Sequence, residues 1–260
     1  MKNKIGIIGI GVVGEAVASV MPNAVLYDKY KKIGSIKEIN KANIIFICVP
    51  TPWTKKKGFD LSAIEDAFSI ISGRKIIVIK STVLPGTTEK MQKKYSQHKV
   101  LFNPEFLRQL NAKKEMKMPF EQIIGYTKKS KSVANKILKI LPKAPAEFIV
   151  LAKEAEMFKY FSNVFLSAKV VFANQIYDLC KKLDIDYEKV KEIAEVSPKF
   201  AFTHFNIFSD GYRGYRGACL PKDIKSFIQL GDKVGVDLKL LKSVEKINQE
   251  LLKKNKKAHV

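Results

Sequence analysis

The sequence is poor in several residue types, and each shortage excludes a class of protein. Its 260 residues include three cysteines and no Cys-x-x-Cys pair. We therefore expect neither a disulfide framework nor a bound metal, and the expected location is the reducing cytoplasm. No run of about 18 apolar residues occurs, so no transmembrane helix is expected. The apolar N-terminal run lacks the cleavage site of a signal peptide.

Arginine is scarce although the chain is strongly basic. Lys+Arg total 47 against 25 Asp+Glu, giving a formal net charge of +22, but only four of these residues are arginine. A charge of this size suggests a nucleic-acid partner, whereas recognition of bases and phosphates favours arginine. The lysines are dispersed along the chain. We interpret them as a solvated surface that attracts anionic ligands, and nucleic-acid binding is the least favoured alternative.

Apolar residues, 46% of the chain, fall into short runs that alternate between strand and helix patterns. Strands are expected at 4–9, 24–27, 43–49, 75–79, 99–102, 122–125 and 147–150, and helices at 12–20, 61–71, 87–95 and 130–141. Nearly all-apolar strands such as 43–49 are typical of a parallel sheet covered on both faces. This alternation predicts a Rossmann-type α/β domain with a doubly wound parallel sheet over 1–150.

The pattern changes after residue 150. Residues 152–183 contain no glycine or proline and carry phenylalanine at helical spacing, which predicts one long helix. Shorter helices are expected at 187–196, 223–230 and 238–252, so residues 151–260 should form an all-α domain. A long helix that is apolar on several sides needs partners, and 152–183 is therefore the expected interface of a homodimer.

A glycine-rich turn (residues 9–14, GIGVVG) follows the first expected strand. Gly9 permits the tight turn, Gly11 lets a pyrophosphate approach the backbone, and Gly14 lets the helix pack on the strand. Asp28 lies 19 residues after Gly9, where a carboxylate accepts hydrogen bonds from ribose hydroxyls. It would repel a 2′-phosphate, so NAD is expected rather than NADP. The alternative is a glycine-rich turn beside a surface aspartate.

Three polar loops follow expected strands, at Cys48–Pro52, Lys80–Gly86 and Asn103–Arg108. The carboxyl ends of parallel strands share one edge of a sheet, where ligands bind, so these loops predict a crevice for cofactor and substrate. Cys48 itself is interpreted as a buried strand residue. The residues expected to bind the cofactor are Gly9, Gly11, Val12, Val13, Gly14, Asp28, Val49, Pro50, Thr51, Ser81, Thr82 and Glu105.

A cysteine precedes an expected helix in the segment 217–223 (GACLPKD). Pro221 suits the first turn of a helix. The helix dipole and Lys222 should lower the pKa of the Cys219 thiol and favour the nucleophilic thiolate. Asp223 is close enough to act as a base. The alternative is a buried structural cysteine, and the residues alone leave both readings open.

These motifs resemble those of the UDP-glucose and GDP-mannose dehydrogenases, the nucleotide-sugar 6-dehydrogenase family. Residues 214–223 (GYRGACLPKD) resemble the family signature GFGGxCLPKD. The loops at Val49–Pro52, Lys80–Thr82 and Asn103–Arg108 are similar to family loops in the same order, and Glu156–Asn163 resembles the motif ExxKxxxN. The resemblance covers nearly the whole chain. It implies NAD-dependent oxidation of a nucleotide sugar, UDP-glucose by default, at C6 to the uronic acid.

The resemblance also implies roles for single residues. Cys219 would carry a thiohemiacetal and then a thioester, which water hydrolyses with help from Asp223. Lys159 and Asn163 lie four residues apart on one helical face and would stabilise the oxyanion. Glu105 would act as a base or position water together with Thr82. The residues implied for substrate binding are Phe106, Leu107, Arg108, Lys159, Asn163, Lys199, Tyr215, Arg216 and Gly217.

The sequence departs from the family pattern at several places. Members usually continue into a third domain that binds the nucleotide of the substrate, so we expect a short form that lacks it. Gln109 and Lys199 stand where many members carry glutamate and arginine. Arg216 replaces one of the paired glycines, and we hypothesise that Arg213 and Arg216 clamp the substrate diphosphate; the alternative is a basic surface loop. GDP-mannose or a UDP-N-acetylhexosamine as substrate, and a non-catalytic or partner-dependent binding relic, also stay open.

Overall fold

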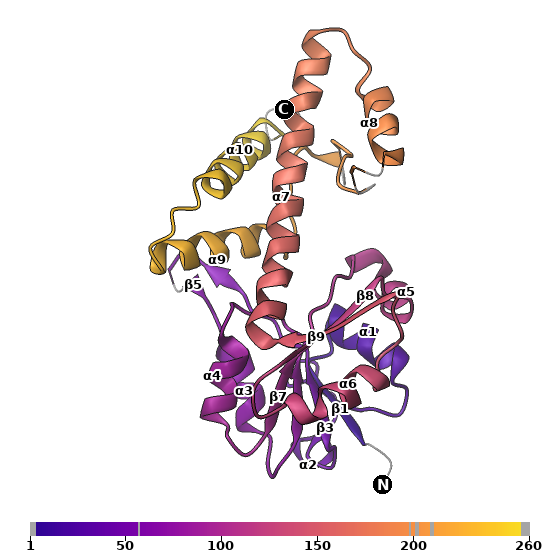
Figure 1. Cartoon of the computed structure of the whole chain (residues 1–260), viewed down its shortest axis with the longest axis vertical. Coiled ribbons are helices and arrows are strands. Elements are labelled where there is room, and N and C mark those ends of the chain that lie inside the picture. The colour runs from indigo at the N-terminus through magenta and orange to yellow at the C-terminus, as the bar shows by residue number, and fades with distance from the viewer. Residues whose placement is uncertain (1–3, 57, 198, 201–202, 209–210, 256–260) are drawn as a thin grey trace. The chain divides into compact units, whose positions relative to one another are not determined.

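A computed structural model describes residues 4–56, 58–197, 199–200, 203–208 and 211–255. The chain divides into two compact units, Met1–Lys159 (unit 1) and Tyr160–Val260 (unit 2). In unit 1, strands and helices alternate around a sheet, and unit 2 is built from helices (Figure 1).

The sheet of unit 1 has seven strands in the order β2-β1-β3-β6-β7-β8-β9. The strands are β1 (Ile5–Ile8), β2 (Val25–Tyr27), β3 (Ile44–Ile47), β6 (Ile76–Ile79), β7 (Lys99–Phe102), β8 (Glu121–Tyr126) and β9 (Ala146–Leu151). The chain moves outward from β1 to β2 and then returns to the other side at β3, so the order reverses between β1 and β3. A reversal of this kind marks the ligand-binding edge in doubly wound sheets, and the predicted α/β architecture is confirmed.

The register brings the polar loops to one edge of the sheet. Ile8 of β1 pairs with Ile47 of β3, Ile47 with Ile79 of β6, and Ile79 with Phe102 of β7, all in parallel ladders. Because these four residues end their strands, the segments that follow them all begin at the same carboxyl edge.

The helices cover both faces of the sheet, which explains the nearly all-apolar strands. Along β3, Ile45 and Ile47 belong to one buried cluster, and Ile44 and Phe46 belong to the other. The main helices of unit 1 are α1 (Val12–Val20), α3 (Ser62–Ser69), α4 (Thr87–Lys94), α5 (Ala112–Lys117) and α6 (Ala134–Ile140). The first cluster includes Phe68 of α3, and the second includes Val17 of α1.

One strand departs from the expected all-parallel arrangement. β8 runs antiparallel to β7, with Phe102 paired to Gly125, and β9 is parallel to β8. A connection between parallel strands must return the chain to the opposite end of the sheet, usually through an α-helix. The segment between β7 and β8 contains a 3-10 turn (Gln109–Asn111) and the six-residue helix α5, which packs against α1. The chain therefore starts β8 near the edge where β7 ended and runs back.

Several short elements of unit 1 were not predicted from the sequence. They are α2 (Ile36–Ile39), α5, and the two-stranded sheet of β4 (Trp53–Thr54) and β5 (Gly58–Phe59). Elements of two to six residues are shorter than the window in which apolar periodicity can be read.

Unit 2 consists of most of α7 (Ala152–Lys182, 31 residues), which begins in unit 1, with α8 (Tyr187–Val196), α9 (Leu220–Lys233) and α10 (Lys239–Asn255). The predicted long helix is confirmed. Val171 of α7 packs with Ile224 of α9 and Val244 of α10. None of the helices in the described ranges is long and apolar enough to cross a membrane.

Helix α9 begins three residues earlier than the sequence predicts. Cys219 is its N-cap and Leu220 its first residue, so Pro221 stands in the first turn. Backbone N–H groups there have no intrahelical partner, and a proline costs nothing at such a position. The helix therefore starts directly behind the cysteine.

Candidate functional site

The glycine turn of unit 1 has the geometry that a dinucleotide needs. Gly9 adopts a φ of +88°, a conformation that favours glycine, and a Cβ on Gly14 would lie 1.9 Å from the carbonyl oxygen of Gly9. Gly11 is the N-cap of α1, and a Cβ there would meet nothing within 4 Å. The space at Gly11 is open where a pyrophosphate would approach, and Val12 and Val13 follow as the first residues of α1.

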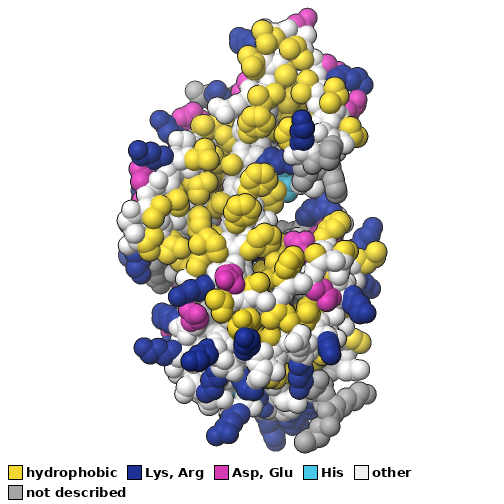
Figure 2. Space-filling model, in the orientation of Figure 1, with side chains coloured by type: hydrophobic (Ala, Val, Ile, Leu, Met, Phe, Trp, Pro, Cys, Tyr) yellow, Lys and Arg dark blue, Asp and Glu magenta, His cyan; other side chains and the backbone are white. Residues whose placement is uncertain are grey.

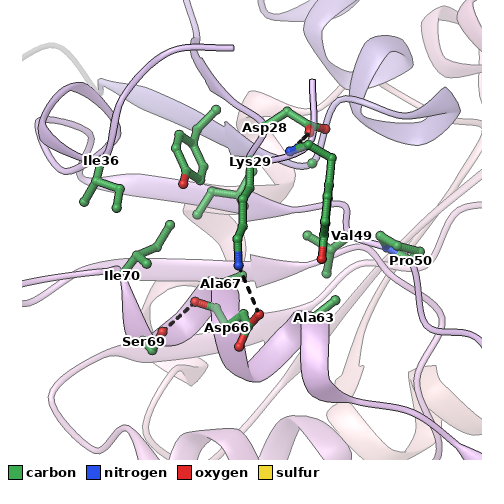
Figure 3. A pocket seen from close by; sticks show the side chains of 14 residues that line it. Asp28, Lys29, Ile36, Val49, Pro50, Ala63, Asp66, Ala67, Ser69 and Ile70 are labelled. Carbon is green, nitrogen blue, oxygen red and sulfur yellow. Dashed lines mark hydrogen bonds and ion pairs between the residues drawn. The ribbon is translucent and has the colours of Figure 1, made fainter. Parts of the chain in front are cut away.

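A pocket of about 330 Å³ lies beside this turn (Figure 3). Its lining includes Gly9, Asp28, Val49 and Pro50, which the sequence assigns to the cofactor. The other lining residues are Ile8, Tyr27, Lys29, Tyr30, Ile36, Ala63, Asp66, Ala67, Ser69 and Ile70. Apolar walls that end at a carboxylate fit a planar base with its ribose, so the residues present suit the adenosine half of NAD.

Asp28 is held in place by backbone N–H groups. Its Oδ2 accepts from Ile10 at 2.8 Å, and its Oδ1 accepts from Tyr30 at 2.9 Å and from Lys31 at 2.8 Å. Burial alone would raise the pKa of Asp28, but these hydrogen bonds and the Lys31 charge outweigh it and lower the pKa. The carboxylate is therefore ionised, and two oxygens with about four acceptor sites leave room for a ribose hydroxyl.

Two of the predicted loops are tied to each other. Ser81 Oγ donates to the Val49 carbonyl at 2.6 Å, and Thr51 Oγ1 donates to the Thr82 carbonyl at 2.7 Å. The segments after β3 and β6 thus form one rim next to the glycine turn. Ser81 and Thr51 are buried, and their hydroxyl protons are donated within this rim. Toward a cofactor these two hydroxyl oxygens could therefore act only as hydrogen-bond acceptors.

The structure brings together Lys159 at the start of α7 and Glu105 in the loop after β7. Lys159 Nζ lies 3.3 Å from Glu105 Oε1 and donates to the Glu105 carbonyl at 2.5 Å. It also lies 5.0 Å from the centre of the Phe106 ring. Burial would raise the pKa of Glu105, but Lys159, the Leu107 N–H and Lys80 outweigh it and lower the pKa. The pair is a buried ammonium–carboxylate pair.

Two further charged residues of unit 1 are buried, and the sequence predicted a role for neither. Lys80 is 2% exposed at the end of β6. Glu156 of α7 accepts from the N–H groups of Gly86 and Thr88 at 2.6 and 2.7 Å. Burial raises the pKa of Glu156 to about 7. The available signal for Glu156 was its place as the first residue of the ExxKxxxN-like motif, three residues before Lys159 and on the same side of a helix.

In unit 2 the structure brings Asn163 and Asp223 together behind the cysteine. Asn163 Nδ2 donates to Asp223 Oδ2 at 2.5 Å, and Lys222 pairs with the other carboxylate oxygen. Asp223 is 1% exposed, whereas Cys219 is exposed at the N-terminus of α9. The backbone N–H of Asp223 donates to the Cys219 carbonyl at 2.9 Å. The thiol thus stands one helical turn before a buried, paired carboxylate.

The remaining predicted substrate residues occupy different environments. Arg108 Nε lies 2.5 Å from Glu115 Oε1. The Tyr215 ring is buried in unit 2, and its hydroxyl donates to Glu245 at 2.7 Å. Lys199 is exposed, and Gly217 has a φ of +86° with open space at the Cβ position.

The two arginines near the cysteine also differ from each other. Arg213 lies 2.7 Å from Asp178 and donates to both the side chain and the carbonyl of Asn174 at 3.0 Å. Arg216 is exposed and stacks over the Tyr212 ring at 4.4 Å. Arg213 therefore braces α7, and Arg216 has the more accessible guanidinium.

Comparison with known proteins agrees with this geometry. Residues 18–141 match the NAD binding domain of the UDP-glucose/GDP-mannose dehydrogenase family, and residues 153–250 match its central domain. A UDP-glucose 6-dehydrogenase of Rickettsia felis is 32% identical over 223 residues, which cover 82% of this chain and 49% of that protein. The chain thus spans about half the length of the curated relatives that it matches.

Solved structures give the same result. A UDP-glucose dehydrogenase from Pyrobaculum islandicum superposes with a TM-score of 0.83 at 26% identity, covering 96% of this chain and 68% of that one. A GDP-mannose dehydrogenase from Pseudomonas aeruginosa superposes with a TM-score of 0.67 at 25% identity, covering 96% and 69%. Unit 1 carries the NAD-binding domain and NAD is its cofactor. Both sequence matches and the fold place the chain in the UDP-glucose/GDP-mannose dehydrogenase family.

Proposed function

We propose that the protein oxidises a nucleotide sugar at C6 to the uronic acid, with UDP-glucose as the first candidate substrate. The observation that carries the proposal is the exposed Cys219 thiol one turn before the buried Asn163–Asp223 pair. Relatives named UDP-glucose 6-dehydrogenase support it at about 30% identity. We further propose that the functional division is a cofactor domain over 1–150 and a catalytic helical domain over 151–260.

The thiol lets one site perform two oxidations. Two NAD molecules bound in succession would supply the hydride acceptors, one for each oxidation. After the first oxidation, the Cys219 thiolate adds to the aldehyde carbon and forms a thiohemiacetal; the second oxidation converts this group to a thioester. Water attacks the thioester carbon, the C–S bond breaks, and the uronate leaves with the thiol regenerated. Asp223 would orient that water or accept its proton.

Negative charge develops on an oxygen of the substrate in each step, and several side chains could stabilise it. Lys159 carries the ammonium that would stabilise an alkoxide or tetrahedral oxyanion, and Asn163 would donate a further hydrogen bond. Glu105 is ionised beside Lys159 and is suited to accept a proton or position water together with Thr82. The further substrate contacts that we propose are Phe106, Leu107, Arg108, Lys199, Tyr215, Arg216 and Gly217.

The decisive experiment measures NADH release from a panel of nucleotide sugars, comparing wild type with Cys219→Ser. We expect two NADH per sugar and a uronic acid from wild type, and no uronic acid from the variant. Cys48→Ser is the matched control, since Cys48 is a buried thiol. An aldehyde as the final wild-type product would show that the covalent mechanism is wrong. Measurable NAD binding without turnover of any sugar would favour a non-catalytic relic.

We also propose that α7 forms the interface of a homodimer. In Figure 2, hydrophobic side chains gather along α7 in unit 2. They include Phe161, Phe165 and Phe172, which are 62%, 56% and 54% exposed. Large exposed apolar patches mark interaction surfaces. Sedimentation at micromolar concentration should give a dimer, and a monomer would contradict the proposal.

A reducing compartment such as the cytoplasm would keep Cys219 as a thiol.

A further inference from the structure

Lys80 is a charged residue in the core of unit 1. It follows β6 at the carboxyl edge of the sheet, and only 2% of its surface is exposed. Its Nζ donates to Asn103 Oδ1 at 2.6 Å and lies 3.5 Å from the Asn103 carbonyl. An ammonium is strongly hydrated in water, so its burial needs compensation.

Asn103 connects Lys80 to strand β8. It is fully buried, and its Nδ2 donates to the Ile123 carbonyl of β8 at 2.9 Å and to Gln122 Oε1 at 3.2 Å. Lys80, Asn103 and β8 thus form one hydrogen-bonded chain across three strands. Asn103 is also the first residue of the loop that carries Glu105, so the chain fixes the root of that loop.

The charges around Lys80 are few and can be named. The titratable groups that interact with it are Cys48 after β3, Glu105 after β7 and Lys159 of α7. Burial raises the pKa of Cys48 to about 12, so this thiol stays neutral. Glu121, on β8, interacts with Lys159, and burial raises its pKa. Around Lys80 itself the charged groups are the Glu105 carboxylate and the Lys159 ammonium, and burial lowers the pKa of Lys80 to about 8.

We propose that Lys80 is a positioning residue for the Glu105–Lys159 pair: through Asn103 it fixes the root of the loop that carries Glu105, and it adds a second buried positive charge to the surroundings of that carboxylate. The inference rests on the proposed function, in which Glu105 moves a proton or positions water. A methionine or leucine would fill the same space without the solvation cost of an ammonium. A buried charge that borders an ion pair in a cofactor-binding unit is thus better explained by its action on that pair.

The test measures the pKa of Glu105 directly, by carbon NMR of protein labelled at the glutamate carboxyl carbon. Glu105→Gln assigns the signal. In Lys80→Met we expect the Glu105 pKa to rise, since a nearby positive charge favours the ionised form. The matched control is Lys75→Met, because Lys75 precedes the same strand and donates to the Asn40 carbonyl at 2.6 Å. An unchanged Glu105 pKa in folded Lys80→Met would overturn the proposal.

A second measurement needs no variant. Burial lowers the pKa of Lys80 to about 8, so the Glu105 signal of wild-type protein should show a second, smaller step as the pH rises through the range in which Lys80 is deprotonated. Absence of that step would also overturn the proposal, even if Lys80→Met fails to fold.

Kinetics supply the functional readout. In Lys80→Met we expect kcat to fall about tenfold or more, with the KM for NAD unchanged and the acid limb of the kcat/KM profile moved to higher pH. A lower kcat with an unmoved acid limb would leave only a structural role and contradict the inference. If wild type oxidises no nucleotide sugar, the proposed function fails on its own, and the two NMR measurements still decide the role of Lys80.

Discussion

Asn248 of α10 pairs with Tyr215 as a backbone strand would. Its Oδ1 accepts from the Tyr215 N–H at 2.8 Å, and its Nδ2 donates to the Tyr215 carbonyl at 3.1 Å. Asn248 is fully buried, and a Cβ on Gly214 would lie 2.5 Å from its Oδ1. The loop that leads to Cys219 is therefore held by the side-chain amide of Asn248, 33 residues after Tyr215.

The first prediction follows from this pairing. In Asn248→Leu both polar groups of Tyr215 lose their partner inside the protein, at a cost of about 1–3 kcal/mol for each. We expect the free energy of unfolding, measured by circular dichroism in urea, to fall by about 2–6 kcal/mol. Gln249→Leu is the matched control, because Gln249 is half-buried and bonds only Glu245 among the contacts described. Equal losses in the two variants would contradict the assignment.

The second prediction separates two glycines of the cofactor turn. Gly14→Ala places a methyl group 1.9 Å from the Gly9 carbonyl oxygen, so it should lower both the melting temperature and the affinity for NAD. Gly11→Ala meets nothing within 4 Å, so it should leave the melting temperature unchanged and still block the pyrophosphate. Calorimetric titration with NAD and thermal melts check both. Undiminished NAD affinity in Gly11→Ala would contradict the assigned position of the pyrophosphate.

The third prediction concerns the pH dependence of stability. Burial raises the pKa of Glu156 from its ordinary 4.5 to about 7, against the hydrogen bonds from Thr88 and Gly86. The folded protein then binds more protons than the unfolded chain between these values, so stability is lost as pH rises from about 4.5 to about 7. A difference of this size corresponds to about 3 kcal/mol.

Glu156→Gln should remove this pH dependence. Urea unfolding between pH 5 and 8 can be followed in unit 1 by fluorescence of Trp53, the single tryptophan of the chain. We expect the variant to gain stability relative to wild type as pH rises. Glu65→Gln is the control, since Glu65 is partly exposed, pairs with Lys94 at 3.3 Å and does not act on Glu156. Parallel pH slopes for wild type and Glu156→Gln would refute the prediction.

The α/β architecture could be predicted from the sequence because it depends on residue patterns within single helices and strands. The run Ile44–Ile47 is apolar at every position, and the structure buries alternate residues on opposite faces of the sheet. The glycine turn and the motif around Cys219 are local in the same sense. The direction of β8 could not be read in this way, because it depends on how far the connection from β7 travels.

The burial of Lys80 and Glu156 could not be predicted from the sequence for a related reason. Lys80 is compensated by Asn103, and Glu156 by Gly86 and Thr88, residues 23 to 70 positions away. Nothing in the neighbouring sequence shows that such a lysine or glutamate is buried, since most of the 43 lysines of this chain would be assigned to the surface. These partners meet only in the folded protein, where the ends of neighbouring strands lie together and α7 contacts the segment 86–88.

The fourth prediction distinguishes the thiols. Burial raises the pKa of Cys48 to about 12, so at pH 8 only about one thiol in ten thousand is ionised. Cys180 is also buried, whereas Cys219 is exposed at a helix N-terminus. Iodoacetamide should therefore modify one site first, and mass spectrometry should place it on Cys219. Rapid modification of Cys219→Ser would show that another thiol is the reactive one.

The last prediction separates the two arginines that flank the cysteine. Arg213 binds Asp178 and Asn174, both on α7, and its side chain is 15% exposed. Arg213→Ala should therefore lower the melting temperature of the protein, because the carboxylate and amide lose a buried partner. Arg216 is exposed over Tyr212, so Arg216→Ala should leave the melting temperature unchanged. If Arg216 binds the substrate diphosphate, the KM for the nucleotide sugar should rise about tenfold or more in Arg216→Ala while the KM for NAD stays constant. Arg216→Lys, which keeps the charge but not the fork of donors, should recover only part of the loss. Equal changes in both KM values would assign Arg216 to a general electrostatic effect rather than to substrate binding.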